Sequence, residues 1–169
     1  MIQRCYSKSF KEYNTNYDNI TVCEEWLYFS NFKSWMEQQD WRGKELDKYL
    51  IVYKNTVYSP DVCVFIPSNI NNFMTKCDKA RGDYYLGASS NGIYGFRANL
   101  INIKTKRKDT IYGLSSPEEA HRLWQINKIE SALFLKNTQT DERIRMGLQR
   151  IANKIQFDLD NNNLITEDF

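Results

Sequence analysis

The stretch LDKYLIVYKNTVYSPDVCVFIPSNINN, residues 46–72, decides the fold expected for the N-terminal half of the chain. Two apolar runs, Leu50–Tyr53 and Thr56–Tyr58, flank a polar turn and predict a short hairpin. A second turn precedes another short apolar strand at Val62–Ile66, and the proline after it predicts a helix over Ser68–Phe73. The segment therefore predicts short strands joined by a loop and followed by a helix.

Length and composition bound the class of protein. The 169-residue chain is long enough for one ordinary domain or two small ones. An apolar content of 41% and an aromatic content of 14% can build a core, which excludes wholesale disorder. No run of about 18 apolar residues exists, so a membrane span is excluded. The N-terminal sequence lacks the apolar stretch of a secretion signal, and a cytoplasmic location is therefore expected.

The four cysteines are widely spaced, at Cys5, Cys23, Cys63 and Cys77, and form no CxxC pair. In a reducing compartment such cysteines are expected as free thiols, mostly buried as small hydrophobic side chains. A structural zinc is not favoured by this spacing, although four thiols could still converge in space.

The net charge of +2 is unevenly distributed. Residues 1–73 carry eight basic and nine acidic side chains, residues 74–137 carry eleven and six, and residues 138–169 carry four and six. The positive charge is therefore concentrated in the middle of the chain. Such a distribution is typical of a domain that binds a polyanion.

The middle of the chain predicts a linker and a sheet. Residues 75–83 are polar and basic and predict the linker. Strand-like runs follow at Tyr84–Ser89, Ile93–Lys104 and Thr110–Leu114, and the sequence KRKD at 106–109 separates the last two. Apolar and polar residues alternate in the second run, so the sheet is expected to have one core face and one polar face.

Three helical segments are predicted outside this sheet. Residues 23–39 place large apolar side chains at spacings of three and four, with a break at Ser30 or Asn31. Ser115–Glu119 has a serine cap, an early proline and carboxylates, and predicts a helix that runs to Leu135 and packs on the sheet. A last helix is expected over Asp141–Ile155, followed by a polar tail.

The only histidine, His121, lies in the helix that is expected to cover the sheet. It follows Ala120 on the side of the helix that faces the sheet. A packed or capping role is therefore expected for it, rather than catalysis.

Residues 84–136 also carry a family pattern. Gly87 and Gly113 lie in the first and third strand-like runs, Phe96–Ala98 is an aromatic–x–alanine element, and Glu118–Ala120 is a Glu-Glu-Ala helix start. In these features the segment resembles the plant APETALA/ethylene-response-factor DNA-binding domain. That family places the polar face of its sheet in the major groove of double-stranded DNA.

The resemblance implies that Arg97 and Asn99 contact bases or phosphates. It implies further DNA contacts beside these two, from Ser89, Tyr94, Lys104, Lys106, Arg107 and Lys108. An ordinary polar sheet face is the alternative interpretation.

The upstream elements RCYSKSFKEY, ITVCEEWLYFSNFKSWMEQQDW and LDK…KNTVYSPDVCVFIPSNINN span residues 1–73. Together they resemble phage-borne HNH homing-type endonucleases, which often carry the same plant-like domain behind the nuclease. A phage-encoded protein would act in the host cell cytoplasm. The chain departs from this family at Lys48, where such a core normally has a histidine, and at Tyr49, where relatives commonly have a second acidic residue.

Hydrolysis of a phosphodiester bond needs an activated water and a stabilised leaving oxygen, and a divalent metal, Mg²⁺ above all, can supply the second. Asp47 is the expected metal ligand, with the amide oxygen of Asn71 beside it. Asn55 lies where an HNH core orients its general base. Lys48 suits that role only if burial lowers its pKa; a fixed positive charge on a phosphate oxygen is the other interpretation.

The fold class expected is α+β, and the leading function is a metal-dependent endonuclease that binds double-stranded DNA. Two alternatives remain open: a catalytically inactive DNA-binding protein on a degenerate HNH scaffold, and an accessory or inhibitor protein that binds another protein. The expected parts are a small HNH-like ββα-metal module at 1–74, a basic linker at 75–83, a three-stranded antiparallel sheet packed on one helix at 84–137, and a C-terminal helix with a polar tail at 138–169.

Overall fold

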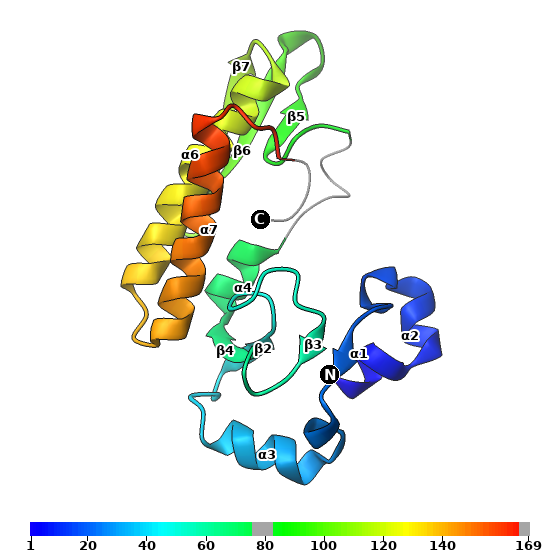
Figure 1. Ribbon diagram of the computed structural model, residues 1–169. Helices are drawn as coiled ribbons and strands as arrows, with labels where there is room; N and C mark the ends of the chain where they lie inside the picture. The colour runs from blue at the N-terminus through cyan, green and yellow to red at the C-terminus, as the bar shows by residue number, and fades with distance from the viewer. Residues whose placement is uncertain (76–82, 166–169) are drawn as a thin grey trace. The chain divides into compact units, whose positions relative to one another are not determined.

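The computed structural model describes residues 1–75 and 83–165. The chain divides into two compact units, unit 1 at Met1–Met74 and unit 2 at Thr75–Phe169. The fold is mixed α and β, with six α-helices and three small sheets within the described residues (Figure 1). The linker predicted at 75–83 lies almost entirely outside these residues, and so does Cys77.

The helices of unit 1 are short. The predicted helical segment at 23–39 is confirmed, but it consists of two pieces separated at Tyr28 rather than at Ser30 or Asn31, because the backbone of Tyr28 is extended. The helical elements of this unit are α1 (Ile2–Tyr6), α2 (Lys8–Tyr13), α3 (Phe29–Glu37) and α4 (Ser68–Met74), with 3-10 turns at Thr15–Tyr17 and Glu24–Leu27.

Two pairs of short strands complete unit 1. β1 (Thr21–Val22) pairs in parallel with β3 (Val57–Tyr58). β2 (Lys44–Asp47) pairs antiparallel with β4 (Val64–Pro67), and α4 follows β4 directly, as predicted.

The predicted hairpin between Leu50–Tyr53 and Thr56–Tyr58 is wrong. Leu50–Tyr53 forms bends and a turn, and the strand that pairs across the loop lies earlier, at β2. The backbone N–H groups of Tyr49 and Leu50 donate to Asp47 Oδ1 at 2.8 and 2.6 Å. These bonds turn the chain immediately after β2, because an aspartate that accepts from the following backbone favours a turn over a strand.

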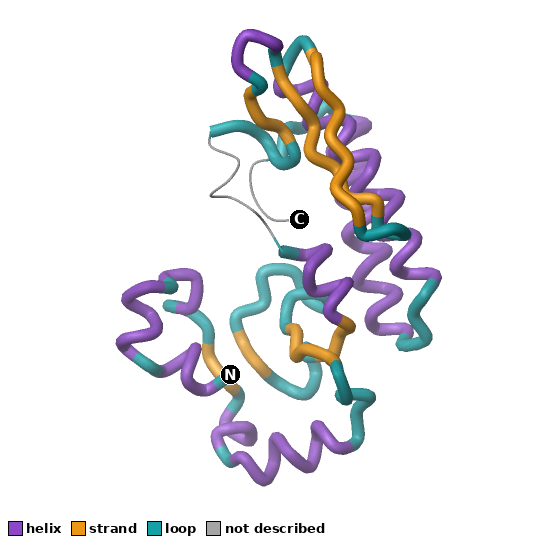
Figure 2. Tube along the Cα trace, turned by 180° about the vertical axis from the view of Figure 1, so that it is seen from behind, coloured by secondary structure: helices purple, strands orange, loops and turns teal. Residues whose placement is uncertain are grey.

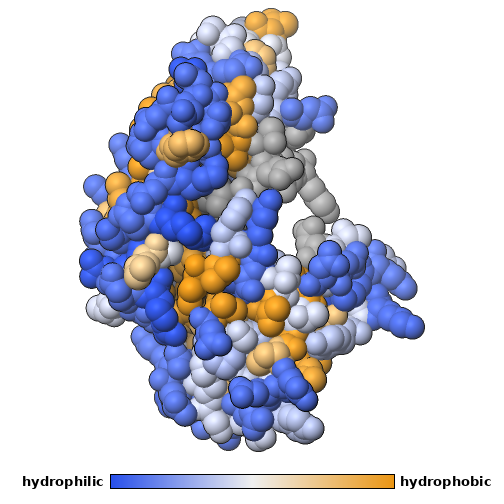
Figure 3. All heavy atoms as spheres, viewed as in Figure 1, coloured by the Kyte–Doolittle hydropathy of each residue, from blue (hydrophilic) through white to orange (hydrophobic). Residues whose placement is uncertain are grey.

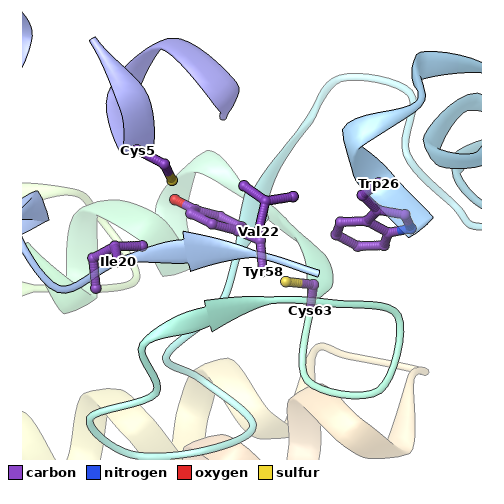
Figure 4. Close-up of a cluster of buried hydrophobic side chains, with 6 residues drawn as sticks. All are labelled: Cys5, Ile20, Val22, Trp26, Tyr58 and Cys63. Carbon is purple, nitrogen blue, oxygen red and sulfur yellow. The ribbon is translucent and has the colours of Figure 1, made fainter. Parts of the chain in front are cut away.

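The core of unit 1 is a small cluster around two buried thiols. Cys5 and Cys63 are completely buried and pack with apolar side chains of β1, β3 and the turn at 24–27. Figure 4 shows the sulfur of Cys5 beside the hydroxyl end of Tyr58. The ring centroid of Trp26 lies 4.6 Å from that of Trp35, so α3 packs against this core through two of the large apolar side chains that recur at helical spacing in residues 23–39. Cys5, Cys23 and Cys63 are free thiols.

Unit 2 contains the expected three-stranded antiparallel sheet, in the order β5–β6–β7. Its strands are β5 (Ala88–Ser90), β6 (Phe96–Asn102) and β7 (Arg107–Leu114), and the 3-10 turn Gly92–Tyr94 joins the first two. Arg107 and Lys108, predicted in the turn between the second and third strands, belong to β7. Figure 2 shows the sheet with both long helices on one side of it, so one face is turned away from them.

The helix predicted to cover the sheet is confirmed as α6 (Pro117–Asn137). The predicted start is confirmed as well: the N–H of Glu119 donates to the Ser116 hydroxyl, and the Ser115 N–H and hydroxyl donate to the Glu119 carboxylate. Buried Ala88, Ala98 and Ala120 line the contact between helix and sheet. These small side chains allow the two layers to approach closely.

The last helix, α7 (Glu142–Asp160), packs against α6 and extends one turn beyond its predicted end at Ile155. The segment after it was expected as a polar tail, but it is hydrogen-bonded into unit 2 as far as residue 165. The N–H of Leu86 donates to the Ile165 carbonyl at 3.0 Å, and the amide of Gln125 donates to the Asn163 carbonyl at 3.3 Å. Residues 138–165 are therefore part of the same compact unit as the sheet.

Candidate functional site

The face of the sheet that is turned away from α6 carries a distinct set of side chains. Ala88 and Ala98 pair across β5 and β6 and are buried toward α6, so their strand neighbours point to the opposite side. We call this side the outer face; it is formed by Ser89, Arg97, Asn99, Ile101, Lys108, Thr110 and Tyr112. No acidic side chain is among these seven positions of the described strands.

Three of the polar side chains on the outer face are bonded to one another. Arg97 Nε and Asn99 Nδ2 each donate to the hydroxyl of Ser89, both at 2.9 Å. The backbone N–H of Asn99 also donates to the Gly87 carbonyl at 2.8 Å. The bond to Nε restrains the plane of the Arg97 guanidinium and does not involve its two Nη groups. A guanidinium held in this way is a preorganised donor for paired acceptors.

The other sequence-predicted DNA-binding residues lie around this face but do not all share it. Lys108 lies on it, opposite Ile101, while Lys106 is in the β6–β7 turn with a positive φ of 58°. Lys104 Nζ lies 5.6 Å from the ring centroid of Phe134, a residue of α6, so this side chain leans toward the helix side. Arg107, the first residue of β7 and the cross-strand partner of Asn102, is exposed.

Tyr94 ends the 3-10 turn between β5 and β6 and is 72% exposed. The turn is fixed by the Asn91 N–H, which donates to the Gly95 carbonyl at 2.8 Å. Gly95 has a φ of +83°, and a Cβ there would lie 2.5 Å from the Leu114 carbonyl oxygen, so only glycine fits. The sheet thus presents Tyr94 at one end and the basic residues of the β6–β7 turn at the other.

Unit 1 holds the other candidate site, at the end of β2. Glu45 and Asp47 are two residues apart on this strand and therefore point to the same side. Asn71 of α4, predicted as a metal ligand beside Asp47, donates from its amide to the Glu45 carboxylate. The structure thus joins Asn71 directly to Glu45, a residue that the sequence reasoning missed. The two-residue spacing from Asp47 on a strand was the signal that could have found it.

Lys48 and Asn55, the two residues predicted to act in catalysis, are brought together. Asn55 Nδ2 donates to the Lys48 carbonyl at 2.9 Å, and Lys48 Nζ donates to the Asn55 carbonyl at 3.2 Å. The Asn55 side chain also bonds both backbone groups of Val57, which fixes the loop between β2 and β3. Lys48 is only 1% exposed, and its Nζ lies 3.1 Å from the ring centroid of Tyr49.

Burial dominates the electrostatics of this site. It lowers the pKa of Lys48 to about 8, although the nearby charge of Asp47 and the thiols of Cys63 and Cys5 act in the opposite direction. Burial likewise raises the pKa of Asp47, against the hydrogen bonds from the backbone of Leu50 and Tyr49. It raises the pKa of Cys63 to about 12. An amine and a carboxyl therefore lie next to each other in the sequence with pKa values displaced toward each other.

The possible metal ligands of this site are oxygen atoms, which a hard divalent cation prefers. The carboxylates of Glu45 and Asp47 and the amide oxygen of Asn71 are oxygen ligands of the kind that Mg²⁺ prefers. Within residues 1–75 and 83–165, no three His, Cys, Asp or Glu side chains lie close enough together to hold a metal ion. A metal here would therefore depend on two carboxylates and an amide.

Comparison of the chain with family models, with curated proteins and with solved structures gives no match. In the part of the chain that the structure describes, no helix is long and apolar enough to cross a membrane.

His121 is buried, as expected, and it lies outside both candidate sites. The N–H of Ile165 donates to its Nε2 at 3.0 Å, so Nδ1 carries the proton and donates to the Leu86 carbonyl at 2.8 Å. Burial lowers the pKa of this imidazole, against the Leu86 bond and the charge of Asp158. His121 is thus a neutral connector between α6, the entry to β5 and the C-terminal segment.

Proposed function

We propose that the protein binds double-stranded DNA through the outer face of the β5–β6–β7 sheet. The observation that carries this proposal is the bonded group of Ser89, Arg97 and Asn99 on a face without carboxylates. The excess of basic residues over positions 74–137 supports it, because a positive surface attracts the phosphate backbone. The resemblance of this segment to the APETALA/ethylene-response-factor domain points to the same ligand.

The residues of the outer face divide by the contacts that their chemistry allows. The Nη groups of Arg97 suit the paired O6 and N7 acceptors of guanine, and the amide of Asn99 suits adenine. Lys108, Lys106 and Arg107 lie at the far end of the sheet, where a flexible or exposed cation suits phosphate. Arg97 and Asn99 at the centre of the face are thus assigned to recognition of the base sequence. The basic residues at its end are assigned to sequence-independent affinity for phosphate.

Binding is tested with the 169-residue chain and labelled duplexes of random sequence across a salt series. Arg97→Gln should weaken specific binding by about ten- to a hundredfold, and Lys108→Gln should lower the slope of log affinity against log salt by about one. Arg122→Gln is the matched control, because it removes one exposed positive charge from α6, on the other side of the sheet. Absence of DNA affinity even at low salt would refute the proposal and favour the protein-binding alternative.

A second candidate function is metal-dependent cleavage of the bound DNA by unit 1. Two antiparallel strands, β2 and β4, are followed by helix α4, which is the element order of an HNH core. Asp47 ends the first of these strands, and the Asn55 side chain donates to the Lys48 carbonyl in the loop after it. The resemblance of residues 1–73 to phage HNH endonucleases supports this assignment.

In such a centre Glu45, Asp47 and Asn71 would hold the metal, which when bound would stabilise the leaving oxygen of the phosphodiester. Asp47 offers its Oδ2 for this, since both backbone donors bond Oδ1. With a pKa of about 8, Lys48 is neutral in a large fraction of molecules near pH 8. Its amine is covered by Tyr49, however, so contact with substrate would require that ring to move aside.

Cleavage is tested on supercoiled plasmid with Mg²⁺ or with EDTA. Asp47→Asn should abolish metal-dependent nicking while it keeps the turn, because an amide oxygen can still accept from Tyr49 and Leu50. Asp61→Asn is the control, because Asp61 is an exposed carboxylate of the same unit, in the turn between β3 and β4. Binding without nicking under any condition would refute cleavage and leave the first proposal intact, as expected of a catalytically inactive DNA-binding protein.

A further inference from the structure

The outer face is not uniformly polar. Ile101 is 48% exposed and Tyr112 is 60% exposed, and both lie on the same side of the sheet as Arg97 and Asn99. Large apolar side chains on an exposed strand face cost free energy in water, and they are common where a surface binds a partner. Their positions therefore call for a ligand that offers apolar groups as well as acceptors.

The pairing of β6 with β7 sets the order of these side chains. Asn99 lies opposite Thr110, and Ile101 lies opposite Lys108 in the next row of the face. Tyr112 lies two residues beyond Thr110, beside the register shift between Phe96 and Ala98. Each apolar side chain thus lies next to hydrogen-bonding or charged ones, at a spacing of about 7 Å along a strand. This interleaving differs from a continuous apolar patch that would bind a helix of another protein.

The exposed apolar residues elsewhere in unit 2 are arranged differently. Those of α7 include Met146 and Phe157, which are 66% and 60% exposed and lie eleven residues apart. On the side seen in Figure 3, hydrophilic residues cover most of this helix. The apolar groups of the outer face, in contrast, share one surface with the Arg97 guanidinium.

We propose that Ile101 and Tyr112 bind the C5-methyl groups of thymine and make the protein selective for thymine-containing sites. This inference rests on the proposed binding of DNA by the same face. In the major groove thymine is the base that presents a methyl group, beside the donors and acceptors of its neighbours. A face on which Tyr112 lies beside Arg97 and Ile101 lies beside Asn99 matches a groove in which methyl groups alternate with acceptors, and its basic charge matches the phosphates on either side.

The test compares thymine with uracil, which lacks only the methyl group. Preferred duplexes are selected with the 169-residue chain from a random pool and then synthesised with deoxyuridine in place of thymine. We expect the wild-type protein to bind the uracil duplex more weakly, by about fourfold for each methyl group that is no longer buried. Ile101→Ser should remove part of this preference, and the double variant Ile101→Ser/Tyr112→Ser should remove all of it.

Ile111→Ser is the matched control. Ile111 pairs with Ala98, so it lies on the opposite face of the same strand, and it is 40% exposed. This variant should keep the full preference for thymine. Circular dichroism of all variants checks that the sheet is intact.

Equal affinity of the wild-type protein for both duplexes would overturn the inference but not the binding of DNA. Retention of the full preference by the double variant would also overturn it. Failure of the 169-residue chain to bind any duplex at low salt would overturn both proposals.

Discussion

Among the described residues, each of the two units buries one basic side chain, and the environments of these two side chains differ. In unit 2 both ring nitrogens of His121 are bonded to backbone groups, and the ring is neutral. In unit 1 the ammonium of Lys48 is bonded to one carbonyl and covered by an aromatic ring, and burial lowers its pKa to about 8. The difference shows that unit 2 uses its buried base to hold segments together, while unit 1 keeps a group that can change its charge near Asp47.

The units also differ in what their elements can contribute to stability. Unit 2 is built on helices of 21 and 19 residues that pack together and cover a sheet. The longest helix of unit 1 has nine residues, and its strands have two to four. Short elements gain little from local propensity, so unit 1 depends on its turns and its small core. Substitutions in the two units should therefore act through different mechanisms.

The largest effect is expected at the contact between sheet and helix in unit 2. Gly87 has a φ of +77°, and a Cβ there would lie 2.1–2.3 Å from side-chain atoms of Trp124. Gly87→Ala must therefore displace the tryptophan and strain the backbone, which should cost about 3–5 kcal/mol of the free energy of unfolding. Urea unfolding, with hydrogen exchange to resolve the two units, measures this loss.

Gly113→Ala is the control for backbone strain alone. Gly113 has a φ of +73°, but a Cβ there would meet open space. Gly113→Ala should therefore lower the free energy of unfolding by only about 1–2 kcal/mol. If both variants lost the same amount, close packing against Trp124 would not be what Gly87 provides.

A smaller loss is expected when the connector of unit 2 is removed. His121→Ala should lower the free energy of unfolding by about 3 kcal/mol at pH 7.5, because it leaves a cavity and removes the partners of the Leu86 carbonyl and the Ile165 N–H. In the same variant, the backbone amide of Ile165 should exchange its hydrogen faster than in the wild type. Unchanged protection at this amide would contradict the assigned bond.

The same histidine predicts a dependence on pH. Its pKa is lower in the folded than in the unfolded chain, so as pH falls below about 6.5 the unfolded chain takes up the proton first. The stability contributed by His121 is therefore complete above pH 6.5 and is lost as pH falls. The difference between the wild type and His121→Ala should shrink from pH 7.5 to pH 5.

The smallest effect, and the one with the opposite sign, is expected in unit 1. Lys48→Met should raise the free energy of unfolding at pH 7 by about 1–2 kcal/mol, because it removes a buried charge and keeps the volume. The folded pKa of about 8 is below the ordinary lysine value of 10.5, so between these two pH values the unfolded chain binds more protons than the folded one. The wild type should gain stability relative to the variant over this range.

Urea unfolding of both proteins at pH 7, 9 and 10 measures whether the difference between their free energies of unfolding decreases as pH rises. Burial also raises the pKa of Tyr58 and that of Cys63, and both groups are present in both proteins. The contribution of Tyr58 cancels in the difference, whereas that of Cys63 does not cancel completely, because the charge of Lys48 lowers the pKa of this thiol. An advantage of Lys48→Met that stays constant with pH would show that the lysine does not lose its proton in the folded state.

Much of unit 2 could be predicted from the sequence because its signals are local and long. The alternation in β6 and the cap at Ser116 with Glu119 follow from chemistry within a few residues. In unit 1 the apolar run Leu50–Tyr53 has the composition of a strand, but the carboxylate of Asp47 turns the chain before it. A single side chain outweighs strand propensity there because the competing strand is only four residues long.

The two candidate sites also differ in how much of each could be predicted from the sequence. The sequence placed Arg97 and Asn99 on one face, and strand pairing confirmed that they share it with Ser89. It did not find Glu45, because the contact with Asn71 joins residues that are 26 positions apart. It also gave no sign that Lys48 is buried, since burial depends on how the loop closes over it.

The sequence by itself determined the α+β class, the helix starts, the alternating strands and the basic middle of the chain. Each of these follows from propensity, periodicity or charge that neighbouring residues express together. Tertiary structure decided which strands pair across the loop at 48–63, which nitrogen of His121 carries its proton, and how far burial lowers the pKa of Lys48. These depend on groups far apart in the sequence, whose solvation and hydrogen bonding are set only when the chain has closed around them.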